Sequence, residues 1–406
     1  MPIDTGNTAW ILVSTALVML MTPGVALFYS GMVRRKNVLS TIMMSFGALA
    51  LIGVLWVLFG YSFGFGPDLG GIIGNFEFLG LNNVGMEATG DNGVPHLAFM
   101  MFQGMFAIIS VALITGAVVE RIKFSSLLVF SALWLAIIYA PVAHWVWGGG
   151  WLGELGALDF AGGTVVHINA GISALALVLL LGPRKGFFKK AMEPHNIPMV
   201  AIGASLLWFG WFGFNAGSAL AADGLAASAF VATNTAAAAA ALTWILLGWR
   251  HRRPTILGAA TGAIAGLVAI TPAAGFVSPM AAMGIGIGAA VVCYYSMIFI
   301  KSKLGFDDSL DVFAVHGMGG IWGALATGIF ATASIGGVNG LIAGNAGQLG
   351  IQFIAVTAVA AFAFGGSWLL GKLVDKTMGL RVKDMEEEVG LDISQHGERA
   401  YGGIVR

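Results

Sequence analysis

Eleven long apolar stretches, separated by short polar gaps, make up most of this 406-residue chain. They lie at residues 8–31, 40–64, 95–119, 125–147, 160–182, 197–217, 224–248, 255–274, 280–300, 311–332 and 348–371. About 20 apolar residues in a helix cross the roughly 30 Å hydrocarbon core of a bilayer. The strict alternation of apolar and polar residues that is typical of a membrane barrel is absent. The pattern therefore predicts an all-α integral membrane protein with 11 transmembrane helices.

The basic residues divide the polar gaps into two alternating groups. All 20 Lys and Arg residues lie in every second gap or in the C-terminal tail: Arg34, Arg35, Lys36, Arg121, Lys123, Arg184, Lys185, Lys189, Lys190, Arg250, Arg252, Arg253, Lys301, Lys303 and every base from Lys372 to Arg406. Because Lys and Arg stay on the cytoplasmic side during insertion, we expect the N-terminus outside and the C-terminus inside. The first stretch precedes its basic cluster, which favours a retained helix over a cleaved signal.

Composition supports a membrane protein. The chain is 58% hydrophobic and 10% charged, with a mean hydropathy of +0.87, which excludes a soluble domain of this length. Its 60 glycines show no collagen-like period and are typical of closely packed membrane helices. The single cysteine, Cys293, lies within an apolar stretch, so neither a disulfide framework nor a thiolate metal site is expected.

The two halves of the chain resemble each other weakly. Leu158-Asp159-Phe160 and Val166-His167 open the fifth stretch, and Leu310-Asp311-Val312 and Val315-His316 open the tenth. A glycine follows each histidine by four residues, at Gly171 and Gly320. We expect inverted five-helix repeats at about 8–182 and 197–332, with an eleventh helix at about 348–371. Residues 1–371 would form the transmembrane domain and residues 372–406 a cytoplasmic tail.

His167 and His316 lie well inside apolar stretches, and an ionisable side chain there marks a functional site by default. At 1.5 Å per residue, His167 lies about 12 Å inward of Asp159, and His316 about 7–8 Å outward of Asp311. The two histidines could therefore meet near the bilayer centre and form a polar path in an apolar pore. The alternative is a structural hydrogen-bonded pair. A metal site is disfavoured because no third ligand lies at the same depth.

Aromatic and small polar side chains gather at the outer ends of three stretches. Phe102 and Phe106 lie one helical turn apart, as do Phe214 and Ser218, and Trp147 ends the fourth stretch. Each alone is typical of packing or of an interfacial aromatic belt. Together they outline an outer cup with an indole face and a hydroxyl group, closed beneath by phenyl rings. An indole face attracts a small cation by about 0.5–2 kcal/mol.

Several of these motifs resemble those of the ammonium transporter (Amt/Rh) family. They are Asp159-Phe-Ala-Gly-Gly-Thr-Val-Val-His167-Ile-Asn169, Gly210-Trp-Phe-Gly-Phe-Asn-Ala-Gly-Ser218, Ile270-Thr-Pro-Ala-Ala-Gly275 and Asp311-Val-Phe-Ala-Val-His316-Gly. The tail is similar too, in Gly379-Leu-Arg-Val, Glu387-Glu-Val-Gly-Leu-Asp392 and His396-Gly-Glu-Arg-Ala-Tyr401. The resemblance covers essentially the whole chain and is closer to the Amt branch than to the Rh branch.

The resemblance implies a role for each residue of the outer cup. Trp147 and Ser218 would form the outer ammonium site, with Phe102 lending a second ring. Phe106 and Phe214 would form a stacked gate beneath it.

For the pore, the resemblance implies that Asp159 holds the architecture of the outer site and that His167 and His316 are the twin pore histidines. It also implies a multi-pass protein of the cell membrane that assembles as a homotrimer with one pore in each subunit. A PII-type nitrogen regulatory protein would bind the cytoplasmic face, where residues 372–406 would act as a regulatory tail.

Desolvation favours the neutral form of an amine, so ammonium entering the apolar gate should lose its proton and cross as ammonia. Potassium has no proton to lose and should be excluded. A proton relayed separately through the histidine pair would make transport electrogenic. The alternative function is an ammonium sensor that signals through its tail. A general cation channel would require carbonyl or carboxylate rings, and an enzyme would require a nucleophile–base pair or a cofactor. Neither function is expected, nor is nucleic-acid binding.

Overall fold

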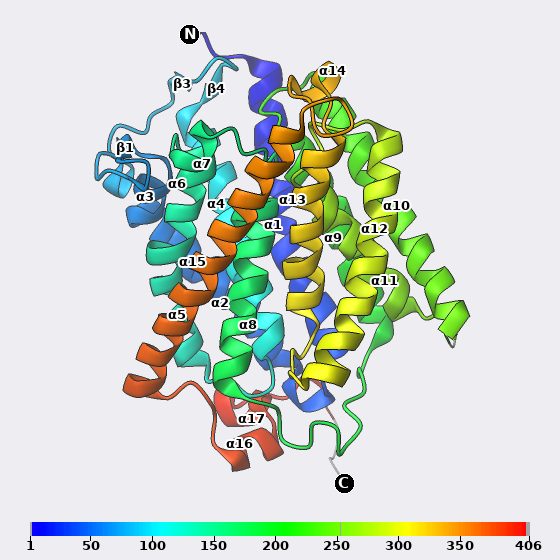
Figure 1. Ribbon diagram of the computed structural model, residues 1–406. Helices are drawn as coiled ribbons and strands as arrows, with labels where there is room; N and C mark the ends of the chain where they lie inside the picture. The colour runs from blue at the N-terminus through cyan, green and yellow to red at the C-terminus, as the bar shows by residue number, and fades with distance from the viewer. Residues whose placement is uncertain (1, 252, 403–406) are drawn as a thin grey trace.

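A computed structural model describes residues 2–251 and 253–402 of the chain. Arg252, Arg406 and the last residues of the predicted tail lie outside this part. The described residues form a bundle of long helices that run between two ends, with the N-terminus at one end and the C-terminus at the other (Figure 1).

The first half of the chain supplies five long helical segments, three of which contain short π-helical turns. They are α1 (Thr5–Met32); α2 (Val38–Leu55) continued by η2 (Trp56–Gly60) and α3 (Tyr61–Phe65); α4 (His96–Val118); α5 (Phe124–Trp134) continued by η4 (Leu135–Tyr139) and α6 (Ala140–Trp147); and η5 (Gly163–Ile168) continued by α8 (Asn169–Leu181). π-Helical turns are rare and are often found at functional sites.

The second half supplies six more long segments. They are α9 (Ile197–Gly217); α10 (Gly224–His251); α11 (Ile256–Ile270); α12 (Pro279–Phe299) continued by η6 (Ile300–Leu304); η7 (Phe313–Met318) continued by α13 (Gly319–Phe330); and α15 (Ala346–Met378).

Short elements connect the long segments or follow them. The helical ones are η1 (Arg35–Asn37), η3 (Leu79–Leu81), α7 (Trp151–Glu154), α14 (Ala333–Gly336), α16 (Asp384–Val389) and α17 (Leu391–His396). Two antiparallel strand pairs, β1 (Asp68–Leu69) with β2 (Ile73–Gly74) and β3 (Ala88–Thr89) with β4 (Val94–Pro95), lie in the first long polar gap.

Ten helices of the described residues are long and apolar enough to cross a membrane. The eighth predicted stretch, 255–274, forms only the 15-residue helix α11, which is about 22 Å long at 1.5 Å per residue. The helix ends at Ile270, just before Pro272, because proline disfavours the helical conformation of the preceding residue. The carbonyl group of Pro272 instead accepts a hydrogen bond from the Phe160 amide at 3.1 Å.

The connecting segments sort by charge between the two ends of the bundle. At one end, basic segments meet: the side chain of Arg34 binds Glu120 at 3.0 Å, and that of Arg184 binds Asp307 at 2.7 Å. The tail helices α16 and α17 lie at this end (Figure 1). Segments without Lys or Arg meet at the other end, where the amide of Asp4 donates to the Gly93 carbonyl at 3.0 Å.

The two histidine-bearing segments, η5–α8 and η7–α13, cross inside the bundle with unusually close backbones. A side chain at Gly171 would collide with the backbone of Gly317, and one at Gly320 would lie 2.9 Å from Cγ1 of Ile168. Glycine is required here by close approach. The positions of Gly171 and Gly320, each four residues after a histidine, are thus explained by this crossing.

Candidate functional site

The outer cup is assembled from α4, α6 and α9. Trp147, the last residue of α6, donates its indole Nε1–H to the carbonyl oxygen of Asp159 at 2.9 Å, which fixes the orientation of the indole ring. The rings of Phe102 and Phe106 meet at 4.9 Å on α4. Ser218 caps α9 and donates its hydroxyl proton to the Phe214 carbonyl at 2.8 Å. The lone pairs of that hydroxyl group can therefore accept a hydrogen bond from a ligand.

Phe106 and Phe214 close the floor of the cup. Their ring centroids are 4.4 Å apart with an interplanar angle of 35°, and both side chains are buried. Phe106 also meets the Trp147 ring edge-on at 5.9 Å. The cup and the ring pair are thus one continuous aromatic cluster.

Asp159 organises the start of the fifth span. Its carboxylate oxygens accept hydrogen bonds from four successive backbone amides, those of Gly162, Gly163, Thr164 and Val165, at 2.6–3.2 Å. The Thr164 hydroxyl donates a fifth, very short bond. The carboxylate satisfies amides that a helix start otherwise leaves unpaired, and it holds the Asp159 carbonyl group that orients Trp147.

His167 and His316 meet below the ring pair. Their Nδ1 atoms are 3.2 Å apart and their rings are nearly parallel, with an interplanar angle of 23°. Both side chains are buried. Nε2 of His167 has no hydrogen-bond partner among the described residues. The ring of Phe214 lies 6.0 Å from that of His167, so the histidine pair follows the ring pair directly.

A narrow apolar cavity of about 10 Å³ runs beside both histidines. Its walls include Met21, Val25, Leu207 and Ile264. A volume of this order holds about one water-sized molecule. The arrangement can therefore offer one small polar solute a ring nitrogen in otherwise apolar surroundings.

Trp211 belongs to this site, although the sequence did not single it out. Its ring stacks on His167 at 5.4 Å and 22°, and its Nε1–H donates to the Thr271 hydroxyl at 2.8 Å. Trp211 lies three residues before Phe214, on the same face of α9. That spacing was the available signal.

The structure also changes the expected match between the two histidine segments. Asp308, rather than Asp311, stands eight residues before His316, as Asp159 stands eight before His167. Asp308 accepts the Phe313 amide at 2.7 Å, at the start of η7. Asp311 instead binds Nζ of Lys301 at 2.7 Å.

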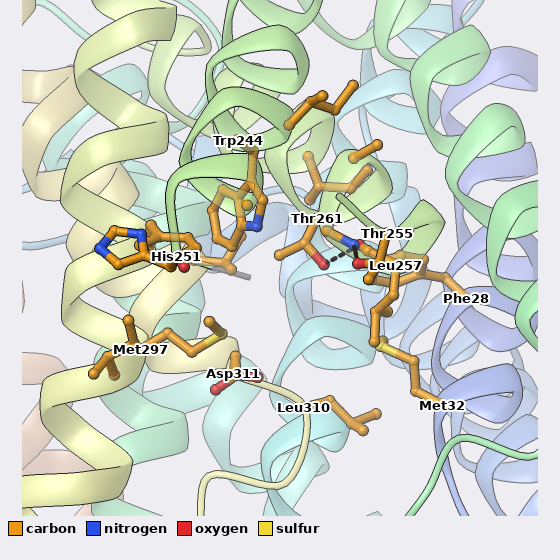
Figure 2. Close-up of a pocket in the computed structure, with 18 of the residues that line it drawn as sticks. Phe28, Met32, Trp244, His251, Thr255, Leu257, Thr261, Met297, Leu310 and Asp311 are labelled. Atoms are coloured by element: carbon orange, nitrogen blue, oxygen red, sulfur yellow. Dashed lines mark hydrogen bonds between the residues drawn. The ribbon is translucent and has the colours of Figure 1, made fainter. Parts of the chain in front are cut away.

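On the inner side of His316, a larger cavity of about 530 Å³ opens. Figure 2 shows Trp244 and His251 across this cavity from Phe28, with Asp311 near its lower edge. Because His316 also lines it, the cavity continues the path from the histidine pair toward the tail end of the bundle.

The tail folds against the inner loops. The Glu387 carboxylate is buried and accepts bonds from the Lys185 amide at 2.5 Å and the Arg381 guanidinium at 2.8 Å. The amide of Ser40 donates to the Asp392 carboxylate at 2.8 Å.

The sequence also pointed to Arg184 as a tail contact, and that expectation was wrong. Arg184 pairs with Glu120 and Asp307 of the inner loops at 2.7 Å. Burial would raise the pKa of Glu120, but the guanidinium groups of Arg184 and Arg34 outweigh it and lower the pKa to about 2. The carboxylate therefore stays charged at neutral pH.

Comparisons with known proteins agree along the whole chain. The sequence profile described as the Ammonium Transporter Family matches residues 9–401. "Ammonium transporter Amt1" of Archaeoglobus fulgidus is 54% identical over 397 residues, which are 98% of this chain and 99% of that protein. "Ammonium transporter" of Bacillus subtilis is 51% identical over 401 residues, 98% of each chain.

Solved structures give the same result. Mep2 of Saccharomyces cerevisiae superposes with a TM-score of 0.89 at 36% identity, covering 95% of this chain and 89% of that one. A structure described as "Sensor Amt Protein" superposes with a TM-score of 0.90 at 32% identity, covering 96% of this chain and 98% of that one.

Proposed function

This chain belongs to the ammonium transporter family, and we propose that it binds ammonium in the outer cup, removes a proton there and conducts ammonia past His167 and His316. The family is one of transporters rather than enzymes, and the chain is a multi-pass membrane protein. Binding, deprotonation and conduction are each supported by a separate part of the geometry.

Binding is supported by the orientation of two groups in the cup. The indole of Trp147 is fixed by its bond to Asp159, so its ring face is available for a cation–π contact of about 0.5–2 kcal/mol. The Ser218 hydroxyl has already donated its proton and can accept an N–H of ammonium. Ammonium satisfies both groups at once.

Deprotonation is supported by the closed ring pair. Phe106 and Phe214 offer no hydrogen bonds, so an ammonium ion would lose its hydration there without compensation. An isolated charge in such surroundings is strongly disfavoured, whereas neutral ammonia is not. The proton is therefore lost at or above the rings, and ammonia passes when they part. An ion of similar size without a proton cannot take this route.

Conduction is supported by the tautomers that the histidine pair must adopt. A hydrogen bond between two Nδ1 atoms requires one to donate and the other to accept. The histidine that donates from Nδ1 leaves Nε2 as an acceptor, and its partner carries a proton on Nε2. The pair thus presents ammonia with one acceptor and one donor. A proton shared along it is the natural route for separate proton transfer.

For topology we propose eleven crossings, with α11 as the short eighth, the N-terminus outside and the C-terminus inside. The proposal rests on the alternation of basic gaps and on their meeting at the tail end of the bundle. The residues from Lys372 onward would be a cytoplasmic regulatory tail. A homotrimer and a PII-type partner at this face are further proposals from the family resemblance.

A sensor is the second candidate function. It is favoured by the docked tail, in which Glu387 and Asp392 are buried against the inner loops, and by the likeness to the "Sensor Amt Protein" structure. A sensor would couple occupancy of the pore to the position of the tail. Transport would then be slow or absent.

The observation that carries the proposed function is the buried contact between His167 and His316 on two inverted segments. Electrical recording on the purified protein in liposomes tests it. A saturating, ammonium-dependent current supports transport with separate proton transfer, whereas ammonium uptake without current supports passage of ammonia alone. Absence of both, with ammonium still bound, would favour the sensor.

A further inference from the structure

Asp308 occupies the inner position that Asp159 occupies on the outer side, yet its environment is different. Both carboxylates precede a pore histidine by eight residues and cap the start of a π-helical turn. Both are buried, with exposed fractions of 7% for Asp159 and 1% for Asp308. The comparison isolates what each carboxylate has been given by its surroundings.

Asp159 is saturated and Asp308 is not. Asp159 receives four amides and the Thr164 hydroxyl. Asp308 receives only the Phe313 amide, on Oδ2, and its Oδ1 is buried without a partner among the described residues. Phe313 stands where the other segment has Thr164, three residues before the histidine, so no hydroxyl group is present. A buried carboxylate with a free oxygen is costly when it is charged and can be relieved by a proton.

The charged and titratable groups that face Asp308 come from several segments. Asp311 and Lys301 lie beside it, Tyr29 of α1 packs nearby, and Arg121 follows α4. Burial, and then repulsion from Asp311, raise the pKa of Asp308 to about 6, against the attraction of Lys301. The carboxyl group gains a proton as the pH falls through about 6. Above that pH it is charged.

The inner cavity lies next to this group. Asp311 and Tyr29 both line it, and so does His316. A change of one unit charge at Asp308 therefore alters the potential at the place where ammonia leaves the histidine pair. A negative charge beside an amine favours its protonated form.

We propose that Asp308 is a proton-binding site at the inner end of the pore, which exchanges a proton between its free oxygen and the inner cavity. On uptake, an O–H bond forms at Oδ1 and the carboxylate charge is neutralised; on release, the proton returns to water in the cavity. When charged, Asp308 helps ammonia to regain a proton inside. The role in transport rests on the proposed function, whereas the proton-binding site itself does not.

Infrared difference spectroscopy of the purified protein, without ammonium, tests the site directly. The parent should show a protonated-carboxyl band at pH 5 that disappears with a midpoint near pH 6. The band should be missing in Asp308→Asn, whose amide oxygen still accepts the Phe313 amide. Asp311→Asn should move the midpoint to lower pH by removing repulsion, and Lys301→Met should move it to higher pH by removing attraction.

Transport completes the test. The initial rate of ammonium uptake into liposomes should fall as the inner pH is lowered through about 6, and this dependence should be lost in Asp308→Asn. A missing band, or a midpoint that neither neighbouring variant moves, would overturn the inference even if ammonium is transported. A titrating band in a protein that transports no ammonium would leave the site intact and contradict the proposed function. An unchanged pH profile in Asp308→Asn would overturn the transport role.

Discussion

Gly171→Ala tests whether the close crossing of the two histidine segments is what brings the histidines into contact. The new Cβ atom would lie 2.5 Å from Cα of Gly317 and 2.9 Å from the carbonyl carbon of His316, whereas ordinary contact begins at 3.4 Å. Both atoms are backbone, so no flexible side chain can move aside. The segments must separate by about 0.9 Å, the difference between the first contact and the ordinary limit.

The separation is large compared with what the histidine pair tolerates. The Nδ1 atoms are 3.2 Å apart, near the upper limit of a hydrogen bond, and a further 0.9 Å breaks the bond. Overpacking a core costs about 1–3 kcal/mol of folding stability, against a gain in helix propensity of up to about 1 kcal/mol for alanine. We expect a lowered thermal unfolding midpoint and loss of most ammonium uptake.

The matched control is Gly365→Ala on α15, where an added Cβ meets nothing within 4 Å. This variant should keep normal uptake and should be as stable as the parent, or slightly more stable. Uptake is measured in liposomes and the unfolding midpoint in detergent. If Gly171→Ala transports ammonium at the parent rate, the histidine contact is not needed for conduction and the reasoning fails.

Three further predictions concern the cup, the pore and the tail. Trp147→Leu combined with Ser218→Ala removes a cation–π contact and about one hydrogen bond, so uptake should weaken roughly ten- to hundredfold at low ammonium and recover at high ammonium. His167→Asp or His316→Glu should admit potassium, measured as a potassium current, because a fixed carboxylate lets an intact cation dwell in the pore. Deleting residues 381–406 should lower or deregulate transport, and should abolish inhibition by a PII-type partner, because the tail contacts with the inner loops are lost.

Each of these predictions has an outcome that contradicts it. Uptake that is unchanged at every ammonium concentration in the double cup variant would indicate a plain aromatic belt. Continued exclusion of potassium by both carboxylate variants, with normal ammonium conduction, would make the histidines structural. A truncated protein that transports normally and is still blocked by the partner would show that the tail is dispensable. Gel filtration of each variant shows whether it remains folded.

The sequence predicted the long helices well because membrane burial leaves a direct record in apolar run length. It placed the helix at 197–217 at the residues where α9 is found. It extended the eighth helix to residue 274 because the apolar run continues past Pro272, and apolarity alone does not report where a helix ends. The π-helical turns η5 and η7 were not predicted, because they arise from shifted hydrogen bonds that leave the hydrophobic pattern unchanged.

At the site, spacing predicted which side chains lie on one helix face, as for Phe102 with Phe106. It did not predict partners from distant segments. Arg184 pairs with Asp307, which is 123 residues away, and no local pattern indicates that choice. The importance of Asp308 was missed for a similar reason, since an unpaired oxygen is visible only once all surrounding donors are placed.

The central claim is that the pore selects its substrate by the proton that the substrate can lose, and potassium flux through the unaltered protein tests it most directly. Potassium and ammonium are monovalent ions of similar size, and only ammonium can lose a proton. The measurement compares potassium and ammonium uptake into the same liposomes at equal gradients. The account predicts ammonium uptake with no potassium flux above that of protein-free liposomes. Potassium uptake at a comparable rate would contradict it.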